Sequence, residues 1–120
     1  YEVSLGDTLG RASPGSIARM LLAVRAVVPA GRLAGHLHDT GGRALANIDA
    51  ALSLGVRVFD AAAGGLGGCP YAPGAAGNVA TEAVARHLER LGYETGIDLA
   101  VLDEAAAMAQ AMRGERTANV

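Results

Sequence analysis

The chain has 120 residues, enough for one small domain, and half of them are apolar. Ten arginines and no lysines stand against 12 acidic residues, for a net charge of −2, so the basic excess typical of proteins that bind nucleic acid or anionic membranes is missing. No apolar run reaches the roughly 18 residues that cross a bilayer, and the single cysteine, Cys69, excludes an internal disulfide.

The chain opens with a predicted strand and helix. Residues 1–5 are compatible with a short strand that ends at Gly6-Asp7-Thr8. Ser13-Pro14 then provides an N-cap followed by proline at the first helical position. Apolar residues at spacings of three and four predict a helix that Pro29 stops: Ile17, Met20, Leu21, Val24, Val27 and Val28.

Two further strands and one helix follow in alternation. Residues 33–38 form the second predicted strand. A helix with its apolar side at Leu45, Ile48 and Leu52 comes next, and Gly55 ends it. Residues 56–59 form the third strand, which ends at Asp60.

Residues 61–77 interrupt this rhythm with a long loop rich in glycine and proline, and long loops inside a compact domain are usually functional or disordered. Helices are expected over about 79–91 and from the capping residue Asp98 to Met112. The remaining residues, 113–120, are expected to form a polar tail.

Alternating strands and helices predict an α/β fold with a parallel sheet. Three predicted strands end in aspartate, namely Asp7, Asp39 and Asp60, which suits the active-site rim of a (β/α)8 TIM barrel as well as an open doubly wound sheet. The barrel is preferred because no dinucleotide-binding glycine motif is present. Since a complete barrel takes roughly 200 residues or more, the chain would be about half of one.

The sequence His36-Leu37-His38 is the sharpest chemical pattern. Residues i and i+2 of a strand point to the same face, so both imidazoles would project together near the strand end. Two neutral imidazoles on one face begin a site for a divalent metal. The alternative is a pair of surface or hydrogen-bonded histidines.

Other candidate residues have a structural interpretation beside a functional one. Cys69 would be either a small buried residue or a reactive thiol, and its glycine-rich surroundings favour reactivity. Asn78 would cap a helix or face a metal, and Glu82 would complement a helix N-terminus. Asp7 would be a general base, a partner of a histidine or a turn cap. Arg43, near the presumed rim, could meet an anionic substrate.

Together the motifs resemble those of the hydroxymethylglutaryl-CoA lyase family. They occur in order as Ser4-Leu-Gly-Asp-Thr-Leu-Gly10, His36-Leu-His-Asp-Thr40, Ala44-Leu-Ala-Asn47, Gly65-Leu-Gly-Gly-Cys-Pro-Tyr-Ala72 and Gly77-Asn-Val-Ala-Thr-Glu82. The resemblance implies that residues 1–112 are the C-terminal portion of a TIM-barrel lyase domain. It also implies a homodimer as a possible state of the full-length parent, and roles in leucine degradation and ketone body metabolism.

The resemblance implies the following chemistry. His36 and His38 would bind Mg²⁺ or Mn²⁺ with Asn78 near or in the coordination sphere, and Cys69 would be the catalytic thiol on a mobile loop over an acyl-CoA substrate. Asp7 and Glu82 would lie in the active-site neighbourhood. The implied reaction cleaves 3-hydroxy-3-methylglutaryl-CoA to acetyl-CoA and acetoacetate.

The sequence also departs from the family pattern. Leu37 stands where a cysteine is usual, Ala61-Ala62-Ala63 replaces a pair of serines, and no Arg-Asp-Gly strand with an acidic metal ligand is present. We therefore expect a fragment that needs the N-terminal half of its barrel and is inactive alone. The alternatives are a condensing acyl-CoA synthase of the same barrel family and a non-catalytic half-barrel module. The arginine-only, alanine-rich composition indicates a bacterial source and hence the cytoplasm.

Overall fold

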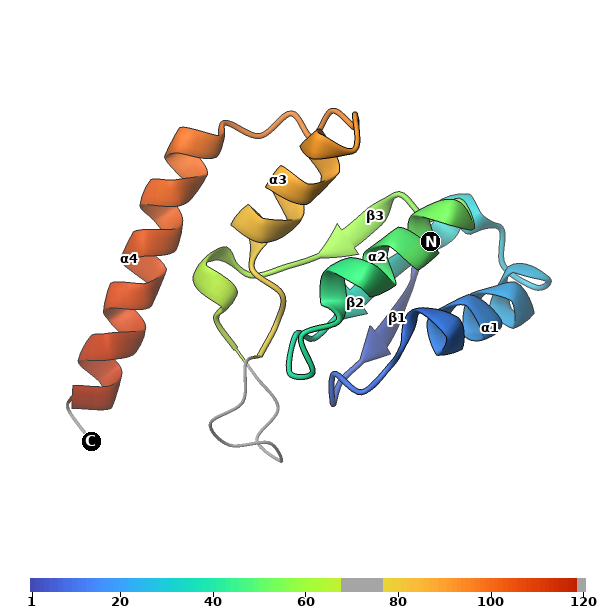
Figure 1. Cartoon of the computed structure of the whole chain (residues 1–120), viewed down its shortest axis with the longest axis horizontal. Coiled ribbons are helices and arrows are strands. Elements are labelled where there is room, and N and C mark those ends of the chain that lie inside the picture. The colour runs from blue at the N-terminus through green and yellow to red at the C-terminus, as the bar shows by residue number, and fades with distance from the viewer. Residues whose placement is uncertain (68–76, 119–120) are drawn as a thin grey trace.

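The computed structural model describes residues 1–67 and 77–118, with side chains up to residue 112. Strands and helices alternate along the chain (Figure 1). The elements are β1 (Val3–Asp7), α1 (Pro14–Arg25), the 3₁₀ turn η1 (Ala30–Arg32), β2 (Leu33–Leu37), α2 (Ala44–Ser53), β3 (Val58–Asp60), the 3₁₀ turn η2 (Ala63–Gly65), α3 (Thr81–Arg90) and α4 (Leu99–Ala118).

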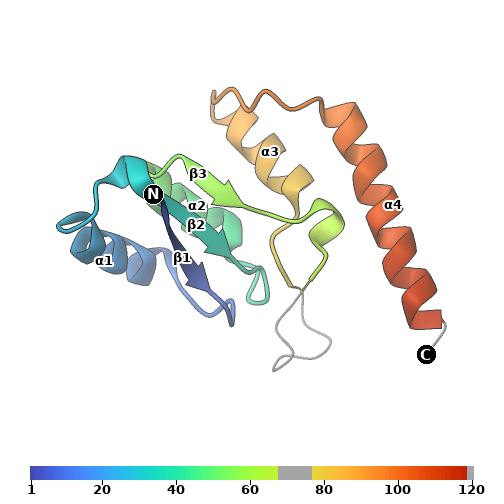
Figure 2. The ribbon, with the colours of Figure 1, turned by 180° about the vertical axis from the view of Figure 1, so that it is seen from behind.

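The strands form a parallel sheet in the order β1-β2-β3, which confirms the α/β prediction. In its register Gly6 lies opposite His36, and His36 lies opposite Asp60. Helices α1 and α2 cover one face of this sheet, and the view from behind shows the strands in front of them (Figure 2). One face of the sheet therefore packs on helices, and the side chains of Ser4 and Asp60 on the other face are exposed.

The core between the sheet and its helices is aliphatic, as expected from a chain with one phenylalanine and no tryptophan. Ile48 is fully buried and Leu33 is 1% exposed, so α2 and β2 form the centre of this core. The other buried members are Ile17, Leu21, Leu37, Ala44, Ala51, Leu52, Val56, Val79 and Val84.

Helix α1 begins as its sequence predicts. Ser13 caps the helix through a reciprocal capping box with Ser16, with Pro14 in the first turn. The helix ends at Arg25, however, and not just before Pro29; a turn follows in which the amides of Val27 and Val28 both bond to the carbonyl of Val24. The predicted apolar stripe was therefore too long, and Val27 is 84% exposed.

Two strands are shifted from their predicted positions. β1 runs through Asp7 and not only to residue 5. β3 begins at Val58, because the amide of Val56 still bonds to Ala51 at the end of α2 and the strand pairing starts where Val58 meets Ala34.

The chain after β3 adds a short paired segment and two helices. Asn78 forms an antiparallel bridge with His38, and Ala80 forms a parallel bridge with Ala62. Helices α3 and α4 follow on the far side of β3 (Figure 1). The buried residues Ala106 and Ala109 of α4 lie beside η2, and this helix continues to Ala118, past its expected end at Met112.

Candidate functional site

His36 and His38 lie close together, as their i, i+2 spacing predicts. The centroids of the two imidazole rings are 5.4 Å apart and the ring planes are inclined by 54°. His38 is buried, whereas 41% of the His36 side chain is exposed. One imidazole of the pair is therefore shielded from solvent, and solvent or a ligand can reach the other.

Asn78 lies directly opposite His38. The amide of Asp39 donates to the carbonyl of Gly77 at 2.9 Å, and the amide of Val79 donates to the carbonyl of Leu37 at 3.3 Å, so these bonds hold the two segments in register. Residues opposite each other in such a pair have Cβ atoms only about 4.5–5.5 Å apart. The pairing therefore brings Asn78 beside His38 despite 39 intervening positions in the sequence.

Two polar atoms at this place are buried without a hydrogen-bond partner: Nδ1 of His38 and Oδ1 of Asn78. The amide nitrogen of Asn78 donates to the carbonyl of Leu66 at 3.1 Å, which leaves its oxygen as the remaining acceptor. A buried polar atom without a partner costs about 1–3 kcal/mol. Imidazole nitrogens and amide oxygens are both metal ligands, so His36, His38 and Asn78 fit a divalent cation.

This set of ligands lacks a carboxylate. Across residues 1–67 and 77–118, no group of three or more His, Cys, Asp and Glu side chains is arranged to hold a metal ion. Mg²⁺ and Mn²⁺ prefer oxygen ligands, so two imidazoles and one amide form only part of a site for them.

Asp60 is a neighbour of His36 that the sequence analysis did not include among the site residues. Its Oδ2 lies 3.5 Å from Nδ1 of His36 and accepts a hydrogen bond from Oγ of Ser4 at 3.4 Å. Three strands thus contribute one side chain each to this contact. The sequence predicts Asp60 at the end of the third strand, but it does not predict the strand register that places Asp60 opposite His36.

Asp7 binds the loop that follows its own strand. Its Oδ1 accepts from the amide of Arg11 at 3.2 Å and its Oδ2 from the amide of Ala12 at 3.0 Å. Of the three roles considered for Asp7, these contacts support the turn cap, and its catalytic role remains a prediction. Asp39 has a similar local contact, because its Oδ1 accepts from the amide of Ala44 at the start of α2.

Glu82 connects α3 to the segment after β3. Both carboxylate oxygens accept from the amide of Gly64, at 3.0 and 3.1 Å. Gly64 belongs to η2, within the glycine-rich segment, so Glu82 holds η2 against the first turn of α3. Arg43 is exposed immediately before α2, and Cys69 lies outside the described residues.

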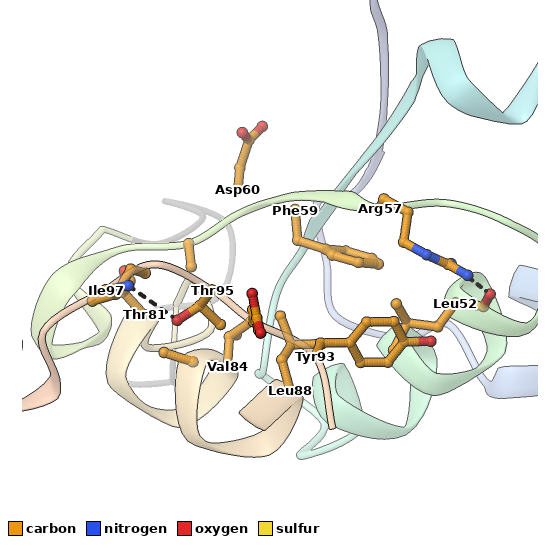
Figure 3. A pocket seen from close by; sticks show the side chains of 13 residues that line it. Leu52, Arg57, Phe59, Asp60, Thr81, Val84, Leu88, Tyr93, Thr95 and Ile97 are labelled. Carbon is orange, nitrogen blue, oxygen red and sulfur yellow. Dashed lines mark hydrogen bonds between the residues drawn. The ribbon is translucent and has the colours of Figure 1, made fainter. Parts of the chain in front are cut away.

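A cavity of about 580 Å³ lies between β3, α3 and the segment that follows α3 (Figure 3). Phe59 points into it, whereas the carboxylate of Asp60 points away, as alternation along a strand requires. The histidine pair does not line this cavity. Its lining residues are Leu52, Arg57, Phe59, Asp60, Ala61, Thr81, Val84, Ala85, Leu88, Tyr93, Glu94, Thr95 and Ile97.

Arg86 and Asp103 form an ion pair on the surface, away from the histidine pair. A hydrogen bond from Arg86 on α3 lowers the pKa of Asp103 on α4, and the same bond raises the pKa of Arg86. Both side chains are well exposed, so the pair joins the two helices only weakly.

Comparison with known proteins decides the family. The HMGL-like family model matches residues 1–109, which include the paired histidines and Asn78. The chain belongs to the HMGL-like family. This HMGL-like chain is 50% identical over 119 residues to the hydroxymethylglutaryl-CoA lyase of Pseudomonas mevalonii, covering 99% of the chain and 39% of that enzyme.

Two solved structures have the same fold as this HMGL-like chain. The HMG-CoA lyase of Brucella melitensis is 60% identical with a TM-score of 0.93, over 94% of this chain and 40% of that one. An HMG-CoA lyase of Acinetobacter baumannii, in complex with coenzyme A and 3-methylmalate, is 42% identical with a TM-score of 0.86, over 94% and 37%. The chain therefore spans about two-fifths of these relatives, and its sheet is part of a TIM barrel, as predicted.

Across the described residues of this HMGL-like chain, no helix combines the length and the apolar character that crossing a membrane would need.

Proposed function

We propose that this chain supplies the C-terminal part of the active site of a hydroxymethylglutaryl-CoA lyase. The complete site would cleave 3-hydroxy-3-methylglutaryl-CoA, an acyl-CoA, to acetyl-CoA and acetoacetate. The observation that carries the proposal is the convergence of His36, His38 and Asn78, with one nitrogen and one oxygen buried and unpartnered. Such atoms are the ligands that a divalent cation would take.

In this proposal His36, His38 and Asn78 hold Mg²⁺ or Mn²⁺, and an N-terminal half of the barrel adds an acidic ligand to these three residues. When bound, the cation polarises the tertiary hydroxyl and anchors the substrate carboxylate.

The reaction transfers protons and breaks one carbon–carbon bond without oxidation or reduction. The tertiary hydroxyl gives its proton to a base, the bond to the α-carbon of the thioester breaks, and its electron pair forms an enolate. The thiol of Cys69 protonates that carbon to give acetyl-CoA, and the oxygen becomes the ketone of acetoacetate. The proton held by the base then returns to the Cys69 thiolate, so the cycle has no net change in protons. Asp7 remains a candidate base, although loop amides bond to both of its carboxylate oxygens.

Two of the remaining site residues have supporting roles in the proposal. Glu82 anchors η2 through the amide of Gly64, within the glycine-rich segment that carries Cys69. Arg43 would meet anionic groups of the CoA ester from the start of α2. We further propose a homodimeric parent in a bacterial cytoplasm.

Co-expression of the chain with the N-terminal half of a related lyase tests this proposal. We expect the assembly to release acetyl-CoA from 3-hydroxy-3-methylglutaryl-CoA, and the chain alone to release none. His38→Ala should abolish this release, whereas His87→Ala, which changes the histidine that contacts Asp49 and lies outside the pair, should leave it nearly unchanged. A stable but inert assembly would favour the non-catalytic module, and consumption of acetyl-CoA with a keto acid would identify a condensing synthase.

A further inference from the structure

Asp60 and Ser4 place a carboxylate beside one particular nitrogen of His36. Oδ2 of Asp60 is 3.5 Å from Nδ1 of His36, and the hydroxyl of Ser4 donates to the same oxygen at 3.4 Å. The three residues come from β3, β2 and β1. The strand register and the alternation of side chains place them on the sheet face that does not pack on α1 and α2.

Strand register explains why this contact exists. His36 pairs with Asp60 on one side and with Gly6 on the other. Gly6 adds no side chain of its own beside the imidazole on the β1 side. Ser4, two residues before Gly6 on the same face, reaches across β2 and bonds to the Asp60 carboxylate.

A carboxylate only accepts hydrogen bonds, so the nitrogen of a neutral imidazole that faces it carries the proton. The other nitrogen then has a free lone pair. In metal sites a carboxylate on one ring nitrogen orients the ring and makes the opposite nitrogen a better ligand.

We propose that Asp60 is a positioning residue that holds His36 with its proton on Nδ1 and so presents Nε2 as a ligand, and that Ser4 orients the Asp60 carboxylate. The role toward a divalent cation rests on the proposed function. The position of the proton does not, because it follows from the protein's own contacts.

The chain contains an internal comparison. His87 on α3 meets Asp49 on α2 through its other nitrogen, with Nε2 2.6 Å from Oδ1. The same reasoning therefore places the proton of His87 on Nε2. The two His–Asp pairs should show opposite tautomers in one sample.

Nitrogen-15 NMR of the imidazole side chains tests the assignment on the 120-residue chain itself. The nitrogen-15 shifts of a neutral imidazole distinguish the protonated nitrogen from the bare one, and the spectrum is recorded at about pH 8.5, well above the pKa near 6.5 of a histidine in a model peptide. We expect an Nδ1–H pattern for His36 and an Nε2–H pattern for His87. An Nε2–H pattern for His36 in the unaltered chain would overturn the proposal, whatever the variants do.

Variants then separate positioning from folding. Asp60→Ala should move His36 toward the Nε2–H form that neutral imidazole favours in water, and Asp60→Asn, which keeps an oxygen acceptor, should move it less. Ser4→Ala should give a smaller change in the same direction. Asp49→Asn is the matched control and should leave the tautomer of His36 unchanged, and His87 should keep its Nε2–H form, which water favours as well. An unchanged His36 in folded Asp60→Ala would refute the role.

Mn²⁺ affinity of the chain assembled with its N-terminal half gives a second readout. Loss of a carboxylate behind a metal-binding histidine typically weakens binding about 10- to 100-fold, so we expect this loss for Asp60→Ala and no change for Asp49→Asn. If His36 shows the Nδ1–H pattern and the assembly binds no metal, the proposed function fails while the tautomer assignment stands.

Discussion

Gly64 is the position where the structure makes its sharpest stability prediction. Its backbone has φ +68°, a region that costs residues other than glycine about 1–2 kcal/mol. An added Cβ would also lie 2.9 Å from the carbonyl oxygen of Ala106 and 3.3 Å from Cβ of Ala109, both on α4. Such overpacking against backbone typically costs about 1–3 kcal/mol. Gly64→Ala should therefore lower the free energy of unfolding by about 2–5 kcal/mol.

Two other glycines separate the contributions. Gly42 has φ +72°, but an added Cβ would meet nothing within 4 Å, so Gly42→Ala should cost only the backbone part, about 1–2 kcal/mol. Gly31 has neither a positive φ nor a close neighbour, and Gly31→Ala should stabilise the chain by about 0.4–1 kcal/mol through the unfolded state.

Urea unfolding followed by far-ultraviolet circular dichroism suits this series, because the chain has no tryptophan. The expected order of stability is Gly31→Ala, unaltered chain, Gly42→Ala and Gly64→Ala. Equal losses at Gly42 and Gly64 would refute the reasoning, since the contact with Ala106 would then contribute nothing. The order matters for the site because the amide of Gly64 also donates to the carboxylate of Glu82.

Three further changes have defined outcomes. Ile48→Ala removes a fully buried side chain and should cost about 2–5 kcal/mol in urea unfolding, against about 0.5–1.5 for Ile48→Val; equal costs would contradict the packing described. Glu82→Gln replaces a charged acceptor by a neutral one, so its hydrogen bond from the Gly64 amide should weaken by roughly 1 kcal/mol. Hydrogen exchange at the Gly64 amide should then accelerate, and unchanged exchange would argue against this contact. Because Arg86 lowers the pKa of Asp103, their pair stabilises the folded chain above the pKa of about 4 that the unfolded aspartate has, and this stability is lost as the pH falls through the lowered folded pKa. The Tm advantage over Asp103→Asn should thus be small at neutral pH and vanish in acid; an advantage that grew in acid would contradict this sign.

Local features of the sequence predicted much of the fold. The alternation of strands and helices, the cap at Ser13-Pro14 and the apolar spacing of α2 depend on residues within one or two turns of each other. The same holds for the shared face of His36 and His38, which follows from the two-residue period of a strand. The end of α1 was harder to predict, because Val27 and Val28 fit the apolar stripe and yet lie past the last helical turn.

Contacts between distant segments could not be predicted in this way. The pairing of Asn78 with His38 and of Asp60 with His36 depends on strand register, which no local pattern encodes. The same is true of Glu82. An acidic residue in the first turn of a helix is explained by the helix dipole alone, so nothing in the sequence predicts its contact with Gly64, which depends on how α3 packs against η2.

By itself, the sequence determined that strands and helices alternate, that two imidazoles share a face, and which family the motifs resemble, because periodicity, capping and motif spacing act over short stretches of chain. Only the tertiary structure decided which nitrogen of His36 faces a carboxylate, which buried atoms near His38 lack a partner and which amide Glu82 binds. These depend on the packing of helices and strands that are far apart in the chain, and it is this packing that brings their side chains within reach of one another.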